Sequence, residues 1–308
     1  MAQQHLAGQV AVVTGGGRGL GRAIALKLAA EGAKVVVNDL GAELDGTGTS
    51  REFADGVAAE IKQQGGQAVA NYNDISKYEQ ARDVIESAVK QFGRIDILVN
   101  SVGNARPKLL VDCTQEDFDI LIDVMLKGKL YTTQHAAKRM VDQRSGRIVN
   151  LGSNIGLIHM TRRTAYAAAQ VGIFGFSRVA ASELGPYGVT VNSLSPGATE
   201  SRLIRDAMRV SKEHQNHPIL DAAEKGTAFL TPAPPDNLAN VTAYLCTKEA
   251  ANINGQIIYV AGGHLAIAET WLLSKSVYKD GVWGVDELIQ AVPKTMAAGL
   301  ANPAPKRM

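Results

Sequence analysis

Seven short runs of apolar and mostly β-branched residues recur along the chain, separated by stretches with a helical pattern. Most of the runs are continuously apolar rather than alternating, which is typical of strands in a parallel sheet that helices cover on both faces. They occupy residues 10–14, 34–39, 68–72, 95–100, 147–151, 190–194 and 256–260. After the first run, Leu20, Ile24 and Leu28 repeat at four-residue intervals and form the apolar stripe of one helix. This order of elements predicts an α/β fold with a doubly wound, parallel, seven-stranded sheet.

Two segments break this rhythm. Residues 201–235 hold short amphipathic pieces followed by TPAPP, and we interpret them as a substrate lid over the ligand-binding edge of the sheet. The last segment carries Trp271 and Trp283, which indicate that it packs against something. Because no linker rich in Pro, Gly or Ser divides the chain, we expect a single domain over residues 1–263, lid included. The C-terminal extension, residues 264–308, is expected to pack on this domain or on a neighbouring subunit.

The composition excludes several classes of protein. With 45% hydrophobic and 20% charged residues over 308 positions, the chain resembles an ordinary globular protein with ample core material. Its net charge of +2 leaves no electrostatic footprint, so we expect no nucleic-acid and no membrane partner. Cys113 and Cys246 lie in no spacing typical of metal ligands, so we expect no metal and a reducing compartment. Without a signal-peptide pattern or an apolar run near the ~18 residues of a membrane span, a cytoplasmic location is expected.

A glycine-rich segment, TGGGRGLG, follows the first predicted strand and opens the helix that contains Leu20. Gly15, Gly19 and Gly21 permit a tight turn and a close approach of the backbone. The helix N-terminus behind them offers free N–H groups and partial positive charge to a pyrophosphate. In this context the segment predicts a dinucleotide-binding loop, and the sheet is that of a Rossmann fold. The alternative is a merely flexible turn.

The second predicted strand bears on the choice of cofactor. It ends in VVVNDL, with Asp39 eighteen residues after Gly21, where a carboxylate can accept hydrogen bonds from the adenosine ribose hydroxyls. A carboxylate there repels a 2′-phosphate, so NAD is favoured over NADP. Arg18, inside the glycine loop, favours NADP instead, because a guanidinium can pair with that phosphate. Asp39 could also be an ordinary turn former at a strand end.

Several segments fall in the order and spacing of a known family. They are the glycine loop, Asp39, Asp74 in NYNDIS, VNSVG at Asn100 to Gly103, Ser153, Tyr166 and Pro196-Gly197. Over about residues 7–263 the chain resembles the short-chain dehydrogenase/reductase family. Within that range VNDLGAELDGTG, GGQAVANYND, FGRIDILVN and PGATESRL look most like the (3R)-hydroxyacyl-CoA dehydrogenase domain of peroxisomal multifunctional enzymes and its bacterial relatives.

The resemblance implies hydride transfer between a carbinol carbon and a nicotinamide. Tyr166 would take the hydroxyl proton, and Ser153, just beyond the fifth strand, would hold the substrate oxygen. Asp74 and Ile75 would flank the adenine, and the loop from Pro196 to Ser201 would hold the nicotinamide end. The implied cofactor-binding set is Gly15, Arg18, Gly19, Leu20, Gly21, Asp39, Asp74, Ile75, Asn100, Gly103, Tyr166, Gln170, Pro196, Gly197 and Ser201.

The chain departs from the family pattern at two positions. The family normally has Lys four residues after the Tyr, one helical turn on, where this chain has Gln170. A phenol has a pKa of about 10, and an ammonium about 4 Å away at an effective dielectric of 20 contributes roughly 4 kcal/mol, or about three pKa units. Gln170 cannot supply that charge, although it can still hydrogen-bond a ribose hydroxyl. Met125 stands where the family usually has Asn, and it has no donor for a proton-relay water chain.

Four cations lie near these positions in the sequence and are candidates to restore the missing field: Lys127, Lys129, Arg162 and Arg163. The alternative is that they are solvated charges or oligomer contacts. Sequence spacing does not decide between the two, since the Arg pair can lie in a loop.

We therefore predict an enzyme, an NAD-dependent oxidoreductase that interconverts a secondary alcohol, either a hydroxyacyl-CoA or a cyclic alcohol, and a ketone. Its site is a non-standard Tyr-x-x-x-Gln, with Tyr166, Ser153 and Gln170. The alternative is a catalytically weak or inactive cofactor-binding subunit that stabilises a partner dehydrogenase in a hetero-oligomer. The predicted helix at residues 164–184, rich in Ala and Gly, favours a homodimer or homotetramer; its apolar residues could instead be buried within the subunit.

Overall fold

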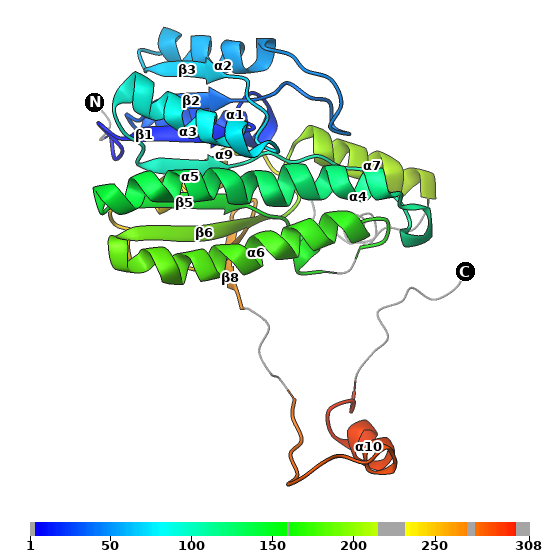
Figure 1. Ribbon diagram of the computed structural model, residues 1–308. Helices are drawn as coiled ribbons and strands as arrows, with labels where there is room; N and C mark the ends of the chain where they lie inside the picture. The colour runs from blue at the N-terminus through cyan, green and yellow to red at the C-terminus, as the bar shows by residue number, and fades with distance from the viewer. Residues whose placement is uncertain (1–3, 159, 215–231, 270–274, 300–308) are drawn as a thin grey trace. The chain divides into compact units, whose positions relative to one another are not determined.

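A computed structural model of the chain describes residues 4–158, 160–214, 232–269 and 275–299. The chain forms two compact units, Met1–Ala268 and Glu269–Met308. In the first unit, helices lie on both faces of one central sheet (Figure 1). Its strands are β1 (Val10–Thr14), β2 (Lys34–Asn38), β3 (Ala68–Asn71), β4 (Ile97–Asn100), β5 (Gly146–Leu151), β6 (Val189–Pro196), β7 (Ile257–Ala261) and β8 (His264–Ala268).

The helices alternate with the strands along the chain. The α-helices of the first unit are α1 (Gly19–Ala30), α2 (Glu52–Gln63), α3 (Tyr78–Phe92), α4 (Gln115–Leu121), α5 (Gly128–Gln143), α6 (Thr164–Leu184), α7 (Arg202–His214) and α9 (Asp236–Leu245). A π-helical segment, η2 (Ile122–Lys127), joins α4 to α5. Short 3₁₀ helices are η1 (Leu110–Asp112), η3 (Asn154–Gly156) and η4 (Gly185–Tyr187).

The predicted doubly wound parallel sheet is confirmed. Its order is β3-β2-β1-β4-β5-β6-β7-β8, and the pairs from β1 to β7 are all parallel. Each of the seven predicted runs holds one of these strands, with ends that differ by at most two residues. The strand order reverses between β1 and β4, and ligands bind at such a switch point in open α/β sheets.

An eighth strand, β8, extends the sheet beyond residue 263 and was not predicted. Ala261 of β7 pairs with His264 of β8 in antiparallel fashion across a two-residue turn, in which Gly262 has a φ of +53°. A positive φ at the first turn residue is what tight hairpins require, so the Gly-Gly pair is the sequence signal for this hairpin. The Leu265 and Ile267 side chains are exposed. For this reason the strand lacks the continuous buried run that marks the other seven.

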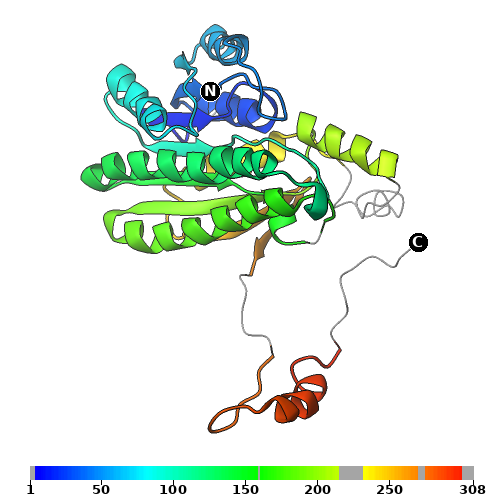
Figure 2. The ribbon, with the colours of Figure 1, turned by 45° about the vertical axis from the view of Figure 1, so that its right-hand side comes forward.

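Two apolar layers hold the helices to the sheet. On one face α1, α2 and α9 pack against the strands, and on the other face α3, α5 and α6 do so (Figures 1 and 2). Ile24 and Leu28 of α1 are fully buried and Leu20 is partly buried, which confirms the predicted apolar stripe.

A polar network inside the sheet joins the central elements. The Asn100 side chain accepts hydrogen bonds from Thr14 (3.2 Å) and Thr132 (2.8 Å) and donates to Asn150 (2.8 Å) and Thr133 (3.2 Å). These contacts connect β1, β4, β5 and α5 just below the carboxyl edge of the sheet. Asn100 is fully buried, and its paired polar atoms set the relative positions of the loops that follow these strands.

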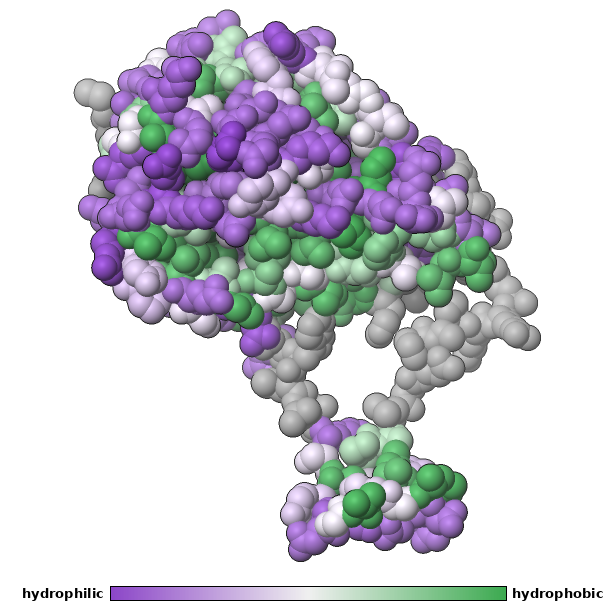
Figure 3. Space-filling model, viewed as in Figure 1, coloured by the Kyte–Doolittle hydropathy of each residue, from purple (hydrophilic) through white to green (hydrophobic). Residues whose placement is uncertain are grey.

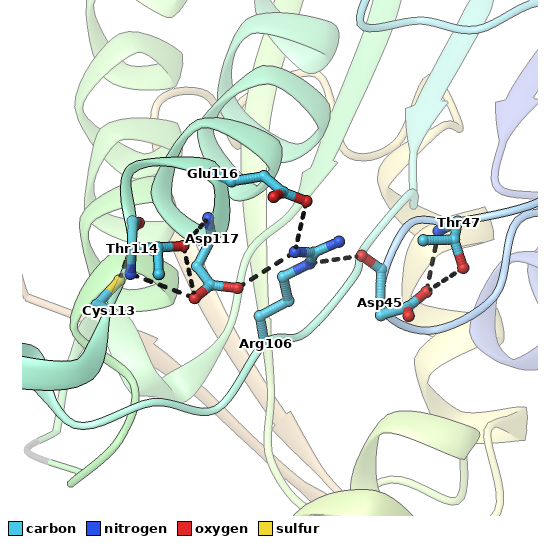
Figure 4. Close-up of polar contacts among 7 residues, drawn as sticks. All are labelled: Asp45, Thr47, Arg106, Cys113, Thr114, Glu116 and Asp117. Atoms are coloured by element: carbon cyan, nitrogen blue, oxygen red, sulfur yellow. Dashed lines mark hydrogen bonds and ion pairs between the residues drawn. The ribbon is translucent and has the colours of Figure 1, made fainter.

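Arg106 ties the loop after β4 to two neighbouring segments (Figure 4). Its guanidinium donates to the Asp45 carbonyl at 2.9 Å and to the carboxylates of Asp117 (3.2 Å) and Glu116 (3.3 Å). Asp117 also forms a capping box with Thr114 at the start of α4. One side chain thus joins the loop after β2, the loop after β4 and the helix that leads into η2.

The second unit contains α10 (Val285–Ala291) and a 3₁₀ turn, η5 (Val292–Lys294). Lys279 forms an ion pair with Glu287 at 2.6 Å and lies 5.3 Å from the ring centroid of Trp283. Trp271, and residues 215–231 of the predicted lid, lie outside the described residues. The lid and the packing of the extension therefore remain predictions.

Candidate functional site

A cavity of about 420 Å³ opens at the carboxyl ends of the parallel strands, around the switch point between β1 and β4. The glycine loop and the ends of β2, β5 and β6 contribute to its walls, together with the first residues of α7. Of the predicted site residues, the cavity is lined by Gly15, Arg18, Gly19, Leu20, Gly21, Asp39, Asp74, Ile75, Gly103, Ser153, Tyr166, Gln170, Pro196, Gly197 and Ser201. Asn100 does not line it, because its side chain points into the network within the sheet.

The glycine loop is packed so tightly that side chains are excluded at two positions. Gly15 has a φ of +66°, and a Cβ there would lie 2.9 Å from the backbone of Val102. A Cβ on Gly21 would lie 2.0 Å from the Gly15 carbonyl oxygen. At Gly19, with a φ of +53°, the nearest atom to an added Cβ is 3.9 Å away, so the loop stays open at the start of α1. No side chain caps α1, and its first N–H groups are available to an anionic ligand.

Asp39 and Arg18 lie together beside this loop. The Asp39 carboxylate accepts hydrogen bonds from the backbone N–H of Gly17 (2.9 Å) and of Gly41 (2.8 Å). The Arg18 guanidinium stacks 3.7 Å from the ring centroid of Phe53 and donates to the Ala42 carbonyl. Burial, with a contribution from the nearby Arg202 cation, lowers the pKa of Arg18. The carboxylate and the guanidinium therefore occupy the same end of the cavity.

Tyr166 lies at the start of α6 and is only 7% exposed. Burial raises the pKa of Tyr166, while a hydrogen bond from the Ser153 hydroxyl and the positive charge of Arg163 act in the opposite direction. The Arg163 guanidinium carbon is 5.8 Å from the centroid of the Tyr166 ring. Ser153 accepts the N–H of Ile155 at 3.3 Å, which holds its hydroxyl at the end of β5. Tyr166, Ser153 and one cation thus meet at the cavity wall.

Arg163 is itself buried, at 5% exposure, and lines the cavity. Its Nη1 has no hydrogen-bond partner among the residues that the structure describes. Burial lowers the pKa of Arg163, although a guanidinium stays charged throughout the ordinary pH range. This side chain therefore brings a positive charge next to Tyr166, although the Asp206 carboxylate acts on the same guanidinium.

Gln170 and Met125 contact each other behind Tyr166. The Gln170 amide nitrogen lies 3.5 Å from the Met125 sulfur, and its amide oxygen has no partner within the described parts of the chain. Both side chains are buried, at 2% and 0% exposure. Met125 sits in the π-helical segment η2, a type of irregularity that often occurs at functional sites.

The four cations proposed from the sequence separate into two groups. Lys129 and Arg163 are buried and line the cavity, whereas Lys127 is half-exposed and pairs with Asp123 at 2.7 Å. Arg162 is only partly buried and does not line the cavity.

The sequence reasoning missed Asn104. Its side chain is 3% exposed, lines the cavity, and has no hydrogen-bond partner for either polar atom among the described residues. It directly follows Gly103 at the end of the VNSVG segment. A polar residue in the loop after a central strand, four residues beyond the end of β4, was the signal for it.

Comparison with known proteins identifies the family. The profile of a family described as Enoyl-(Acyl carrier protein) reductase, a branch of the short-chain dehydrogenases/reductases, matches residues 15–264. The chain belongs to the short-chain dehydrogenase/reductase family and is an enzyme of the oxidoreductase class. Members of this family bind a nicotinamide dinucleotide.

Three curated relatives illustrate the range of the family. The chain is 38% identical over 267 residues to the peroxisomal hydratase-dehydrogenase-epimerase of Neurospora crassa, covering 86% of this chain and 28% of that protein. It is 40% identical over 256 residues to peroxisomal multifunctional enzyme type 2 of Drosophila melanogaster, covering 83% of this chain and 39% of that protein. It is 36% identical to 3-oxoacyl-(acyl-carrier-protein) reductase FabG of Staphylococcus aureus, covering 82% and 96%. The chain thus spans well under half of the two peroxisomal proteins.

Solved structures agree with this assignment. A short chain dehydrogenase from Mycobacterium avium superimposes with a TM-score of 0.79 at 34% identity, covering 95% of this chain and 96% of that one. Levodione reductase superimposes with a TM-score of 0.74 at 28% identity, covering 84% of this chain and 98% of that one.

The described residues contain no helix with the length and apolar character of a membrane span.

Proposed function

We propose that the protein is an NAD-dependent dehydrogenase that interconverts a secondary alcohol and a ketone. The observation that carries the proposal is the placement of Tyr166, Ser153 and the Arg163 cation in the same cavity as an open glycine loop. The loop fits a pyrophosphate, because its backbone N–H groups are uncapped and its glycines leave no side chain in the way.

Each residue has a defined part in this reaction. When bound, the nicotinamide takes the hydride from the carbinol carbon or returns it to the carbonyl. Tyr166 accepts the hydroxyl proton during oxidation and donates it during reduction. Ser153 orients the substrate oxygen toward that phenol, and the Arg163 charge favours the phenolate, because a nearby cation stabilises an anion. Gln170, through its free amide oxygen, accepts a hydrogen bond from a ligand hydroxyl.

The decisive experiment compares wild-type protein with Tyr166→Phe. We expect the wild type to oxidise a secondary alcohol with NAD, with a rate that increases as pH rises, since the phenol must ionise. Tyr166→Phe should lose this turnover by at least 100-fold, the range of general base catalysis, and should still bind NAD. If the variant turns over as fast as the wild type, Tyr166 is not the base.

The preference for NAD rests on Asp39. Its carboxylate lines the cavity and repels a 2′-phosphate, while Arg18 is committed to the Ala42 carbonyl and the Phe53 ring. We expect kcat/KM to be higher with NAD than with NADP, and Asp39→Ala to narrow that difference by 10-fold or more, or about 1.4 kcal/mol. A wild type that prefers NADP would contradict this part of the proposal.

For the substrate we propose a hydroxyacyl thioester, with a cyclic alcohol as the second class. The matching family profile and the Staphylococcus aureus relative carry names that refer to acyl chemistry, and apolar side chains of Met160, Leu203 and Ile204 line the cavity near Tyr166. The test is a panel of (3R)- and (3S)-hydroxyacyl-CoA esters and cyclic alcohols at pH 7 to 10. Absence of turnover across the whole panel would refute the dehydrogenase proposal.

A second function, a weakly active subunit that stabilises a partner dehydrogenase, is favoured by one observation. Gln170 contacts Met125 rather than bringing a charge to the site. Changing Gln170→Lys distinguishes the two functions. A large gain in rate at neutral pH would favour the weakly active subunit, whereas full activity in the native protein that the change only reduces would exclude it.

We also propose a homodimer or homotetramer formed through α5 and α6. Figure 3 shows an apolar band along α6, and exposed apolar side chains there include Leu130 of α5 and Val179 of α6. Ile173 and Phe174 of the same helix are buried within the subunit and do not contribute. Val179→Glu should lower the mass measured by light scattering, while Val111→Glu, the same change at a more exposed valine outside these helices, should not.

Both cysteines are free, which supports a reducing compartment such as the cytoplasm.

A further inference from the structure

Lys129 is a buried ammonium with little to stabilise it. It lies in the first turn of α5, is 2% exposed and lines the cavity. Its Nζ donates to the Leu151 carbonyl, and no carboxylate lies within ion-pairing distance in the described residues. Lys127, two residues earlier, is half-exposed and paired with Asp123 at 2.7 Å. The chain therefore keeps Lys129 of α5 inside the site and Lys127, the last residue of η2, outside it.

Burial of such a group is expensive. Desolvation of an unpaired ammonium costs several kcal/mol, and Leu or Met would fill the same space without that cost. Burial lowers the pKa of Lys129 to about 7. An amine of this kind takes up or releases a proton at neutral pH, which an ordinary lysine does not.

Two contacts link Lys129 and its helix with the reactive end of the cavity. Leu151, whose carbonyl Lys129 binds, is the last residue of β5 and lies two residues before Ser153. Met125 lies one helical turn before Lys129 and contacts Gln170, which lies one turn after Tyr166. Lys129 is thus anchored to the end of β5, in the cavity that Tyr166 also lines, and the helix that carries it contacts α6 through Met125.

The surrounding charges leave Lys129 as the group that can exchange a proton there. The other titratable side chains that line the cavity are Arg18, Asp39, Glu43, Asp74, Lys77, Asp123, Arg163, Tyr166 and Arg202. None of them contributes to the shift of Lys129, which is caused by burial alone. Asp123 is paired with Lys127, and Arg163 cannot deprotonate.

We propose that Lys129 is the proton acceptor behind Tyr166 when the enzyme oxidises an alcohol, and the proton donor when it reduces a ketone. This rests on the proposed dehydrogenase function. In oxidation the carbinol C–H bond breaks, and a bound oxidised nicotinamide would take the hydride with its two electrons. The alcohol proton moves to the Tyr166 oxygen as the phenol proton passes, through hydroxyl groups in the cavity, to the neutral Lys129 amine. The products would be a ketone, the reduced cofactor, a neutral phenol and an ammonium, so protons and electrons balance. Lys129 acts through Tyr166 and is a positioning residue for the proton.

The experiment measures pH profiles in both directions for wild type, Lys129→Met and the control Lys127→Met. In the wild type, oxidation should increase and reduction should decrease across the same neutral range. In Lys129→Met, the pH range in which the oxidation rate increases should move up by two or more units. It should approach the pKa of about 10 of a phenol without a nearby base. Its kcat at pH 7 should fall on the order of 100-fold, while KM for NAD changes less than threefold. Lys127→Met should match the wild type.

Two further measurements separate this role from a structural one. The double variant with Lys129→Met and Gln170→Lys should again show an oxidation rate that increases across neutral pH, because an amine again lies behind Tyr166. In the ligand-free wild type, NMR titration of ¹³C-labelled lysines should show one signal, absent in Lys129→Met, that titrates near neutral pH. If that signal titrates near 10, Lys129 is protonated at pH 7 and the inference is wrong. An active wild type whose profile is unchanged in Lys129→Met also overturns it, whereas a wild type without any turnover overturns the dehydrogenase proposal itself.

Discussion

Replacing Lys129 by Met should stabilise the fold in a pH-dependent way. The folded protein holds the Lys129 pKa at about 7, whereas an unfolded lysine titrates at about 10.4. Between these values the unfolded state binds more protons, so the free energy of unfolding of the wild type increases with pH. Over the two pH units from 7 to 9 this amounts to about 3 kcal/mol, at 1.36 kcal/mol per unit. The Met variant has no such group and lacks this slope.

The variant also loses one contribution to the free energy of unfolding that does not depend on pH. Without Lys129 the Leu151 carbonyl loses its donor, which costs about 1–3 kcal/mol at every pH. The difference in unfolding free energy between variant and wild type should therefore favour the variant most at pH 6 to 7. It should decrease by about 3 kcal/mol by pH 9.

Urea denaturation, followed by circular dichroism at half-unit pH steps from 6 to 9.5, measures this difference directly. All other titrating groups are common to both proteins and cancel. Lys127→Met is the matched control, because it removes the same charge from a half-exposed pair with Asp123, and solvent-exposed ion pairs add little to stability. Parallel stability curves for wild type and Lys129→Met would show that Lys129 has an ordinary pKa, and the reasoning would be wrong.

Two other predictions concern the loops around the cavity. Gly21→Ala places a Cβ 2.0 Å from a backbone carbonyl of the same loop and should weaken NAD binding by more than 10-fold in calorimetry, while Gly56→Ala, with nothing within 4 Å, should leave it unchanged. Arg106→Ala removes the hydrogen bonds to the Asp45 carbonyl and to Asp117, and should lower the free energy of unfolding by about 2–3 kcal/mol in urea titrations. Equal stability of that variant and the wild type would mean that Arg106 does not hold the two loops together.

The architecture of the first unit follows from local patterns. Seven parallel strands were predictable because a strand buried on both faces needs a continuous apolar run, and the chain repeats such runs between helical stripes. The glycine loop was predictable for a similar reason, since the crowding at Gly15 and Gly21 admits no other residue. Strand β8 was not, because an edge strand with exposed Leu265 and Ile267 has no such run.

For the chemistry of the site, the sequence predicts the order of the key residues but not which charges reach them. From the sequence alone one can find the order of Asp39, Ser153, Tyr166 and Gln170, because each follows a strand or opens a helix at a recognisable spacing. Which cations reach the site depends on packing between elements far apart in the chain. Lys127 and Lys129 are separated by one residue, yet the turn of the helix exposes one and buries the other against β5. Only the tertiary structure decides this, since burial and the electric field at Tyr166 are properties of the assembled elements and not of any one segment.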